Sequence, residues 1–465
     1  MGADLDAKYV EMTSTSIPRL VLRLAVPSMV CMVVTALYNV VDAAFVGRLS
    51  TEATAGIGIS FAYMTFIQAV GFFFGHGSGN HISRTLGARR QDDAAQMAAV
   101  GFFTPFIIGV VSAVAGLLFL PHLARLLGAP EAVMPYACDY LRYILIASPF
   151  MMSALTLNNQ LRLQGNASIG MVGIVSGALL NIALDPLLIF TCGLGVTGAA
   201  LATAVSQTFS FVLLWRGTMK PGSVSILLRN FKPTLHSYRE ILAGGLPSLC
   251  RQGFNCAATI MLNYAAAKYA PAGQEASSVA AFAVVSRTMM FAFSLALGFN
   301  QGFQPVSGFN YGAKQYMRVR QAYLFALGGS TLILLAFSTI GFVWAPEIMT
   351  LFRGEDPDMI AIGARTLRWQ CVSFPLIGPS TSTNMLFQNI RMTFRSTLLS
   401  IGRQGIFFVP AILILPMLLG IHGVEMAQAV ADACTFLLAL PFAVWISRKL
   451  KQQGDTMNLS TVNNG

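Results

Sequence analysis

The sequence predicts an all-α polytopic membrane protein, with twelve transmembrane helices in two six-helix bundles related by pseudo-two-fold symmetry. Of its 465 residues, 55% are hydrophobic and only 11% are charged, whereas soluble globular proteins carry about 25% charged residues. The charges lie mainly between apolar runs, and each run is long enough to span a bilayer, which takes about 20 helical residues. A β-barrel would instead show alternating segments of about 10 residues, which this sequence lacks.

Taken in order, the apolar runs and the polar stretches between them divide the chain into five parts. These are a polar cytosolic lead (1–17), an N-lobe (18–217), a basic cytosolic connector (218–238), a C-lobe (239–448) and a polar tail expected to be disordered (449–465). The predicted spans are 18–45, 53–86, 93–120, 132–160, 167–191, 196–217, 239–269, 276–308, 316–345, 358–388, 394–419 and 422–447.

The distribution of lysine and arginine orients these spans. With the N-terminus placed in the cytosol, most of the 30 basic residues fall in inner segments, as the positive-inside rule requires. We therefore expect both termini in the cytosol. The same rule accounts for the net charge of +11 without a nucleic-acid partner. The seven cysteines lack metal-ligand spacing, and we expect free thiols.

The two halves of the chain repeat at nearly one offset. Parallel repeats of this kind give two bundles related by an axis along the membrane normal, with substrate held between them. The matched residues are Pro27 and Pro247 at an offset of 220, Asn158 and Asn384 at 226, and Gly198 and Gly423 at 225.

Two acids stand well inside early spans, Asp42 in the first and Asp185 in the fifth. A carboxylate in hydrocarbon costs a few kcal/mol and usually faces a bundle interior or an aqueous cavity. Asn181 precedes Asp185 by four residues and shares its helix face, while Asn158 and Thr203 supply further uncharged oxygens. This set suits a proton relay or a hard monovalent cation. The alternative is that the acids only hydrogen-bond across a helix interface.

The second half lacks these acids. The counterparts of Asp42 and Asp185 are Leu262 and Pro410, so any ion chemistry is expected in the N-terminal bundle. A third deep acid, Asp432, is expected to pair with Arg403, and the alternative is a position near the cytosolic vestibule.

A glycine-rich stretch, residues 75–80, contains His76 but lacks the lysine of a phosphate-binding loop. We expect it to allow close helix approach, with His76 a hydrogen-bonded structural residue.

The combined motifs resemble the multidrug and toxic compound extrusion (MATE) family over residues 18–448, and most closely the MepA-type members of its DinF-like branch. The motifs are Asn39-x-x-Asp42-x-x-Phe45-Val46-Gly47, Asn158 with Arg162-x-x-Gly165-Asn166, Asn181-x-x-x-Asp185-Pro186, and Gln304-Pro305-x-x-Gly308-x-Asn310-Tyr311-Gly312-Ala313.

The resemblance implies a V-shaped twelve-helix fold and antiport of organic cations. It assigns proton or sodium coupling to Asp42, Asn181, Asp185 and Thr203, with Asn158 as a neighbour. These residues would also hold the metal ion if sodium is used. The NorM-like branch instead uses acids in spans 7 and 10, where this chain offers only Asn255 and Asn384.

We therefore expect a secondary active multidrug exporter, not an enzyme, in the cytoplasmic (inner) membrane of a prokaryote. It would act as a monomer in the lipid bilayer, without a cofactor beyond H+ or Na+, on small amphiphilic cations. The alternative is a flippase for lipid-linked oligosaccharides, for which Arg251, Arg287 and Arg403 are the candidate cationic residues. The residues expected to line the substrate cleft are Asn39, Gln252, Asn255, Arg287 and Gln304.

Overall fold

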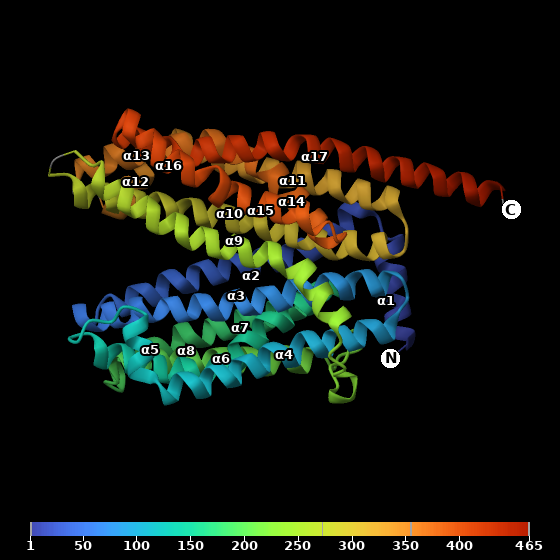
Figure 1. Cartoon of the computed structure of the whole chain (residues 1–465), viewed down its shortest axis with the longest axis horizontal. Coiled ribbons are helices and arrows are strands. Elements are labelled where there is room, and N and C mark those ends of the chain that lie inside the picture. The colour runs from blue at the N-terminus through green and yellow to red at the C-terminus, as the bar shows by residue number, and fades with distance from the viewer. Residues whose placement is uncertain (1, 272, 354–355, 464–465) are drawn as a thin grey trace. The chain divides into compact units, whose positions relative to one another are not determined.

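The computed structural model describes residues 2–271, 273–353 and 356–463, and these ranges are helical without any strand (Figure 1). Ten of the described helices are long and apolar enough to cross a membrane. Helix α9 (Leu235–Lys268) and the pair α13 (Pro357–Ser373) and α14 (Ile377–Asn389) occupy the seventh and tenth places in the order of spans. The predicted all-α polytopic class is confirmed, and the order of the helices agrees with the predicted twelve spans.

The structure divides into two compact units, and the first spans Val26–Leu246 together with the N-terminal segment up to Thr15. Helix α6 is central to it, because α3, α4, α7 and α8 all pack against α6. The helices of this unit are α1 (Gly2–Ser14), most of α2 (Ile17–Val46), α3 (Thr51–Gly87), α4 (Gln91–Leu118), α5 (Leu120–Leu126), α6 (Met134–Leu163), α7 (Ala167–Pro186), α8 (Gly195–Gly217) and the start of α9.

The second unit contains the rest of α9 and all later helices. Helix α11 packs against α10, α13, α14 and α17. The tenth span is interrupted by a short turn at Phe374–Leu376, and the eleventh by a π-helical turn at Gly402–Ile406. The remaining helices are α10 (Glu275–Gly312), α11 (Tyr316–Val343), α12 (Ala345–Arg353), α15 (Thr393–Ile401), α16 (Phe408–Leu419) and α17 (Ile421–Asn463).

The structure differs from the predicted elements mainly outside the spans. The lead forms α1, and short helices α5 and α12 join neighbouring spans. The tail expected to be disordered continues α17 as far as Asn463. Its first turns are held by packing, because Leu450 is buried and Gly454 lies against Met317 of α11. Met1 and residues 464–465 of the predicted lead and tail lie outside the described residues.

The internal repeat is visible in the backbone. Arg89 (φ 57°) and Lys314 (φ 60°), which are 225 residues apart, each adopt a left-handed conformation just after a helix. The amide Nδ2 of Asn158 donates to the carbonyl of Gly170 at 3.1 Å. Its counterpart Asn384 donates in the same way, across twelve residues, to the carbonyl of Ser396 at 2.9 Å. The repeated motifs therefore make equivalent local contacts in both halves.

Two helices begin in the opposite unit from the one that contains most of their length. The start of α2 up to Ala25 belongs to the second unit, and α9 up to Leu246 belongs to the first, so the units differ here from the predicted lobes. Glycines permit both arrangements. A Cβ on Gly302 of α10 would lie 2.3 Å from the backbone of Ala25. A Cβ on Gly77 of α3 would lie 2.4 Å from that of Ile241.

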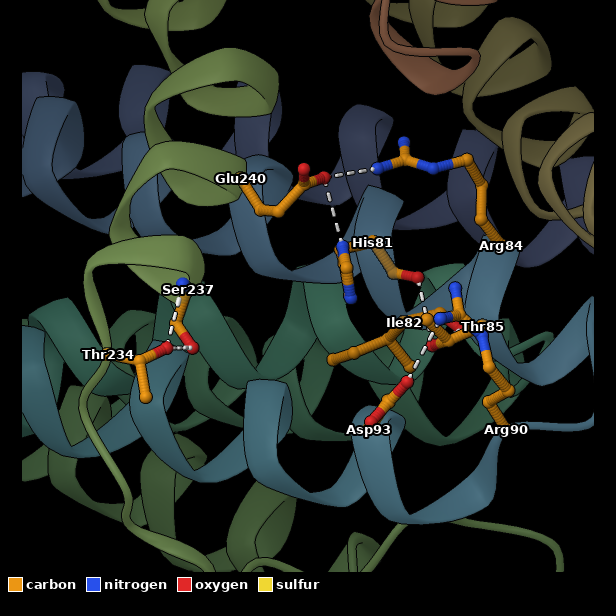
Figure 2. Close-up of polar contacts among 9 residues, drawn as sticks. All are labelled: His81, Ile82, Arg84, Thr85, Arg90, Asp93, Thr234, Ser237 and Glu240. Atoms are coloured by element: carbon orange, nitrogen blue, oxygen red, sulfur yellow. Dashed lines mark hydrogen bonds and ion pairs between the residues drawn. The ribbon is translucent and has the colours of Figure 1, made fainter.

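A buried ionic cluster fixes the start of α9 within the first unit. Glu240 of α9 faces His81 and Arg84 of α3 (Figure 2). Arg84 Nη2 donates to Glu240 Oε2 at 3.0 Å, and His81 Nδ1 lies 3.0 Å from the same oxygen. The side chain of Glu240 is only 3% exposed. A carboxylate desolvated to this extent depends on its partners.

We predict that Glu240→Gln lowers thermal stability, because it removes the buried negative charge that faces Arg84 and His81. Removing one partner of a buried pair costs about 3 kcal/mol. The melting temperature of the protein purified in detergent measures the effect.

Asp93→Asn is the matched control. It removes the carboxylate of an exposed pair with Arg90, whose side chains are 63% and 49% exposed, and such pairs contribute less than about 1 kcal/mol. Equal melting temperatures for the two variants would contradict the anchoring role of Glu240.

Candidate functional site

Helix α2 brings Asp42 into the first unit. The helix ends in the apolar core of this unit, where Val46 is buried and the ring of Phe45 lies 6.2 Å from that of Phe190. Tyr38 lies one turn before Asp42, so both side chains share a helix face. Both residues are half-buried, whereas Asn39 between them is exposed.

Helix α7 supplies the second acid at its C-terminal end. Asp185 is completely buried and Asn181 nearly so. Asn181 Nδ2 lies 3.4 Å from Asp185 Oδ1 and donates to it. Pro186 follows directly and lacks an amide donor, and the chain continues as a π-helical turn at Leu187–Thr191. The carboxyl group therefore sits where the regular helix ends.

The two acids meet inside the first unit. Asp42 and Asp185 lie close enough for their carboxyl groups to interact electrostatically. Tyr38 and Tyr140 of α6 lie near both acids and near Thr203 of α8, and the Tyr140 hydroxyl donates to Met64 Sδ at 3.6 Å. The structure thus brings four predicted residues, Asp42, Asn181, Asp185 and Thr203, into one region, and two tyrosines lie nearby.

Sequence reasoning missed both tyrosines. Tyr38 carried a usable signal, because it stands four residues before Asp42. Tyr140 carried none, since only the packing of α6 against α8 brings it there. The fifth predicted residue, Asn158, donates to the carbonyl of Gly170 and so ties α6 to α7.

The gathered oxygens lack donors. Among the described residues, none donates a hydrogen bond to Asp185 Oδ2 or to Asn181 Oδ1, although both atoms are buried. Asp42 adds a further carboxylate, which is also only an acceptor when ionised. Buried acceptors of this kind are stabilised by a proton or by a cation that oxygen ligands can bind. The cluster therefore has oxygen acceptors of the kind that a proton or a hard cation could satisfy.

The residues expected to touch substrate do not gather in the same way. Asn39 is exposed in the first unit, and Asn255 and Arg287 are exposed in the second. Gln252 is half-buried. Gln304 differs from the expectation of a cleft position, because it is fully buried and its carbonyl accepts a hydrogen bond from the side chain of Asn389. It belongs to the packing of α10 against α14.

The third deep acid is structural, as predicted. Asp432 accepts from Arg403 Nε at 2.7 Å and from Gln428 Nε2 at 2.9 Å through Oδ1. The hydroxyl of Ser373 donates to Oδ2 at 3.4 Å. Arg403 also lies 5.1 Å from the ring centroid of Phe293. Unlike Asp185, this carboxylate has its donors in place.

The glycine-rich stretch also has the predicted packing role. A Cβ on Gly75 would lie 2.9 Å from Asn159, and one on Gly79 would lie 2.5 Å from Leu163, so α3 approaches α6 closely at both positions. His76 is buried, with Nδ1 3.2 Å from the carbonyl of Phe72. The prediction of a hydrogen-bonded structural histidine is confirmed.

The fold and the site together define a multi-pass membrane protein with an acid-bearing helical unit. The chain belongs to the MatE family, whose model matches residues 27–187 and 258–413.

The multidrug export protein MepA of Staphylococcus haemolyticus (strain JCSC1435) is 25% identical over 437 residues, which cover 93% of this chain and 94% of that protein. A crystal structure of MATE in complex with MaL6 is similar with a TM-score of 0.88 at 28% identity, covering 95% of this chain and 99% of that one. An outward-facing multidrug resistance MATE family transporter of the MOP superfamily has the same TM-score and identity, over 95% and 98%.

We predict that neutralising the two kinds of acid has opposite consequences for stability. Asp432→Asn should lower the melting temperature, because it removes the counter-charge of Arg403. Asp42→Asn should leave it unchanged or raise it, because it relieves repulsion between two close carboxylates.

The two variants are compared at neutral pH in the same detergent, and each serves as the control for the other. A loss of stability in Asp42→Asn as large as that in Asp432→Asn would contradict the distinction and make Asp42 a structural residue.

Proposed function

We propose that the protein is a secondary active transporter that exports organic cations by antiport with H+ or Na+. The observation that carries the proposal is the pair Asp42 and Asp185, close together in a helical unit, where no described residue donates a hydrogen bond to the buried Asp185 Oδ2 or Asn181 Oδ1. Two like charges this close in a medium of low dielectric constant repel strongly. A proton or a metal cation relieves that repulsion, so the pair binds one when it can reach the site.

Binding of this ion has to favour one conformation over another. A ligand moves a conformational equilibrium only through its differential affinity for the two states. We infer that the pair binds the incoming ion more tightly in one state, and that release in the other state drives export. The family membership supports transport rather than catalysis. The name of the MepA relative supports substrates that are small drug-like molecules.

Either coupling ion fits the residues present. A proton would be shared by the carboxyl groups of Asp42 and Asp185. Sodium would take oxygen ligands from the same two acids together with Asn181 and Thr203, since hard cations prefer oxygen. We propose no further cofactor.

The charge distribution supports the remaining features of the proposal. Basic residues concentrate in the segments assigned to the inside, and this bias supports the proposal that both termini are in the cytosol. We propose a monomer in the cytoplasmic membrane, with small amphiphilic cations as its substrates.

A flippase for lipid-linked oligosaccharides is the less favoured function. Such a protein needs free cationic side chains to hold a pyrophosphate. Of its three candidates, Arg403 is already paired with Asp432, which leaves Arg251 and Arg287. Resistance to toxic cations on overexpression in a pump-deficient strain supports export, whereas rescue of a cell-wall or capsule defect would favour the flippase.

We predict that Asp42→Asn abolishes efflux of ethidium from cells, because one member of the ion-binding pair can no longer ionise. The measurement is the rate of fluorescence loss from preloaded, re-energised cells, at matched protein levels in the membrane.

Glu52→Gln is the matched control, since it neutralises an exposed acid at the start of α3 in the same unit. It should retain the wild-type rate. Unchanged efflux in Asp42→Asn at normal expression would overturn the proposal.

A further inference from the structure

One face of α17 changes from apolar to cationic within a single turn. The helix has 43 residues and is therefore about 65 Å long, roughly twice the thickness of the hydrocarbon core. Leu437, Leu440 and Val444 are 64%, 46% and 43% exposed. The same face continues into exposed Arg448. A helix that crosses a bilayer places such a transition at the lipid–water interface.

Trp445 marks this interface. Tryptophan is enriched at the level of the lipid headgroups, and this indole contacts two cations. The guanidinium of Arg395, from α15, lies 3.8 Å from the ring centroid. The ammonium of Lys449 lies 5.0 Å from it. Two helices therefore bring positive charge to one aromatic side chain.

A groove of about 730 Å³ opens beside this turn. Leu440 and Val444 line one end of the groove, Arg448 and Lys449 line the other, and Trp445 lies between them. The lining thus matches an amphiphile with an aliphatic chain and an anionic head.

Arg448 and Lys449 line the groove, and Arg395 lies beside it on the Trp445 ring. Within the described ranges, no carboxylate forms an ion pair with Arg395, Arg448 or Lys449. The three therefore present uncompensated positive charge next to an apolar strip. Basic pockets at the cytoplasmic side of transmembrane helices bind the headgroups of anionic lipids.

We propose that this groove is a binding site for an anionic phospholipid of the surrounding bilayer. The phosphate lies among Arg395, Arg448 and Lys449, and an acyl chain follows Leu440 and Val444 toward the bilayer centre. The lipid joins α15 to α17, because its phosphate contacts side chains from both helices. This site is independent of the acid pair in the first unit.

The test is titration of the purified full-length protein with phosphatidylglycerol, with bound lipid counted by native mass spectrometry. The charge of each basic residue near an anionic group strengthens binding several-fold, so the double variant Arg448→Gln/Lys449→Gln should weaken the affinity by roughly tenfold or more. Phosphatidylcholine with identical chains should bind the wild type more weakly than phosphatidylglycerol does. It should bind the wild type and the double variant equally.

The matched control is Arg229→Gln/Lys232→Gln, which removes the same charge from exposed positions in the connector. It should leave phosphatidylglycerol binding unchanged, and equal weakening in both double variants would overturn the site. Arg395→Gln provides a second variant on a different helix and should weaken binding as well.

Inorganic phosphate at millimolar concentration separates a lipid site from a simple anion site. It should fail to displace phosphatidylglycerol, because it cannot occupy the apolar end of the groove. Full displacement would overturn the proposal of a lipid site.

Discussion

The function proposed for the first unit depends on two carboxyl groups that lie close together among apolar helices. Asp42 comes from α2 and Asp185 from the end of α7, and no donor from the described residues reaches the buried Oδ2 of Asp185. The contrast with Asp432 is instructive, because three donors surround that acid. A buried acid with its donors in place stabilises one structure, whereas a pair without them requires an ion. The functional assignment follows from this difference.

Glycines allow helices to pack closely against each other within both units. Gly77 and Gly302 occupy equivalent positions in the two halves, and each allows the backbone of another helix to approach closely. In the first unit, Gly77 allows the start of α9 to pack against α3, and the ion pairs of Glu240 hold the two helices together. Both halves of the repeat therefore have a glycine at this close contact between helices, whereas only the first half has the acid pair.

Much of this architecture was predictable from the sequence, because length and hydropathy determine the position of a helix in a membrane. The approximate limits of the spans follow from the lengths of the apolar runs. The Asp432–Arg403 pair follows from the need of a deep acid for a cationic partner. The roles of Tyr140 and Glu240 could not be predicted in this way, because they arise from packing between helices that are distant in sequence. The sequence also could not predict where α2 passes from one unit to the other, because its apolar residues continue across that point without a change in composition.

The most direct test of the central claim is ion movement driven by the drug. Purified protein is reconstituted in liposomes, an ethidium gradient is imposed without an ion gradient, and internal pH and sodium are followed with indicators. The account predicts counter-movement of one ion in the wild type and none in Asp42→Asn. Equal ion movement in the two proteins would contradict it.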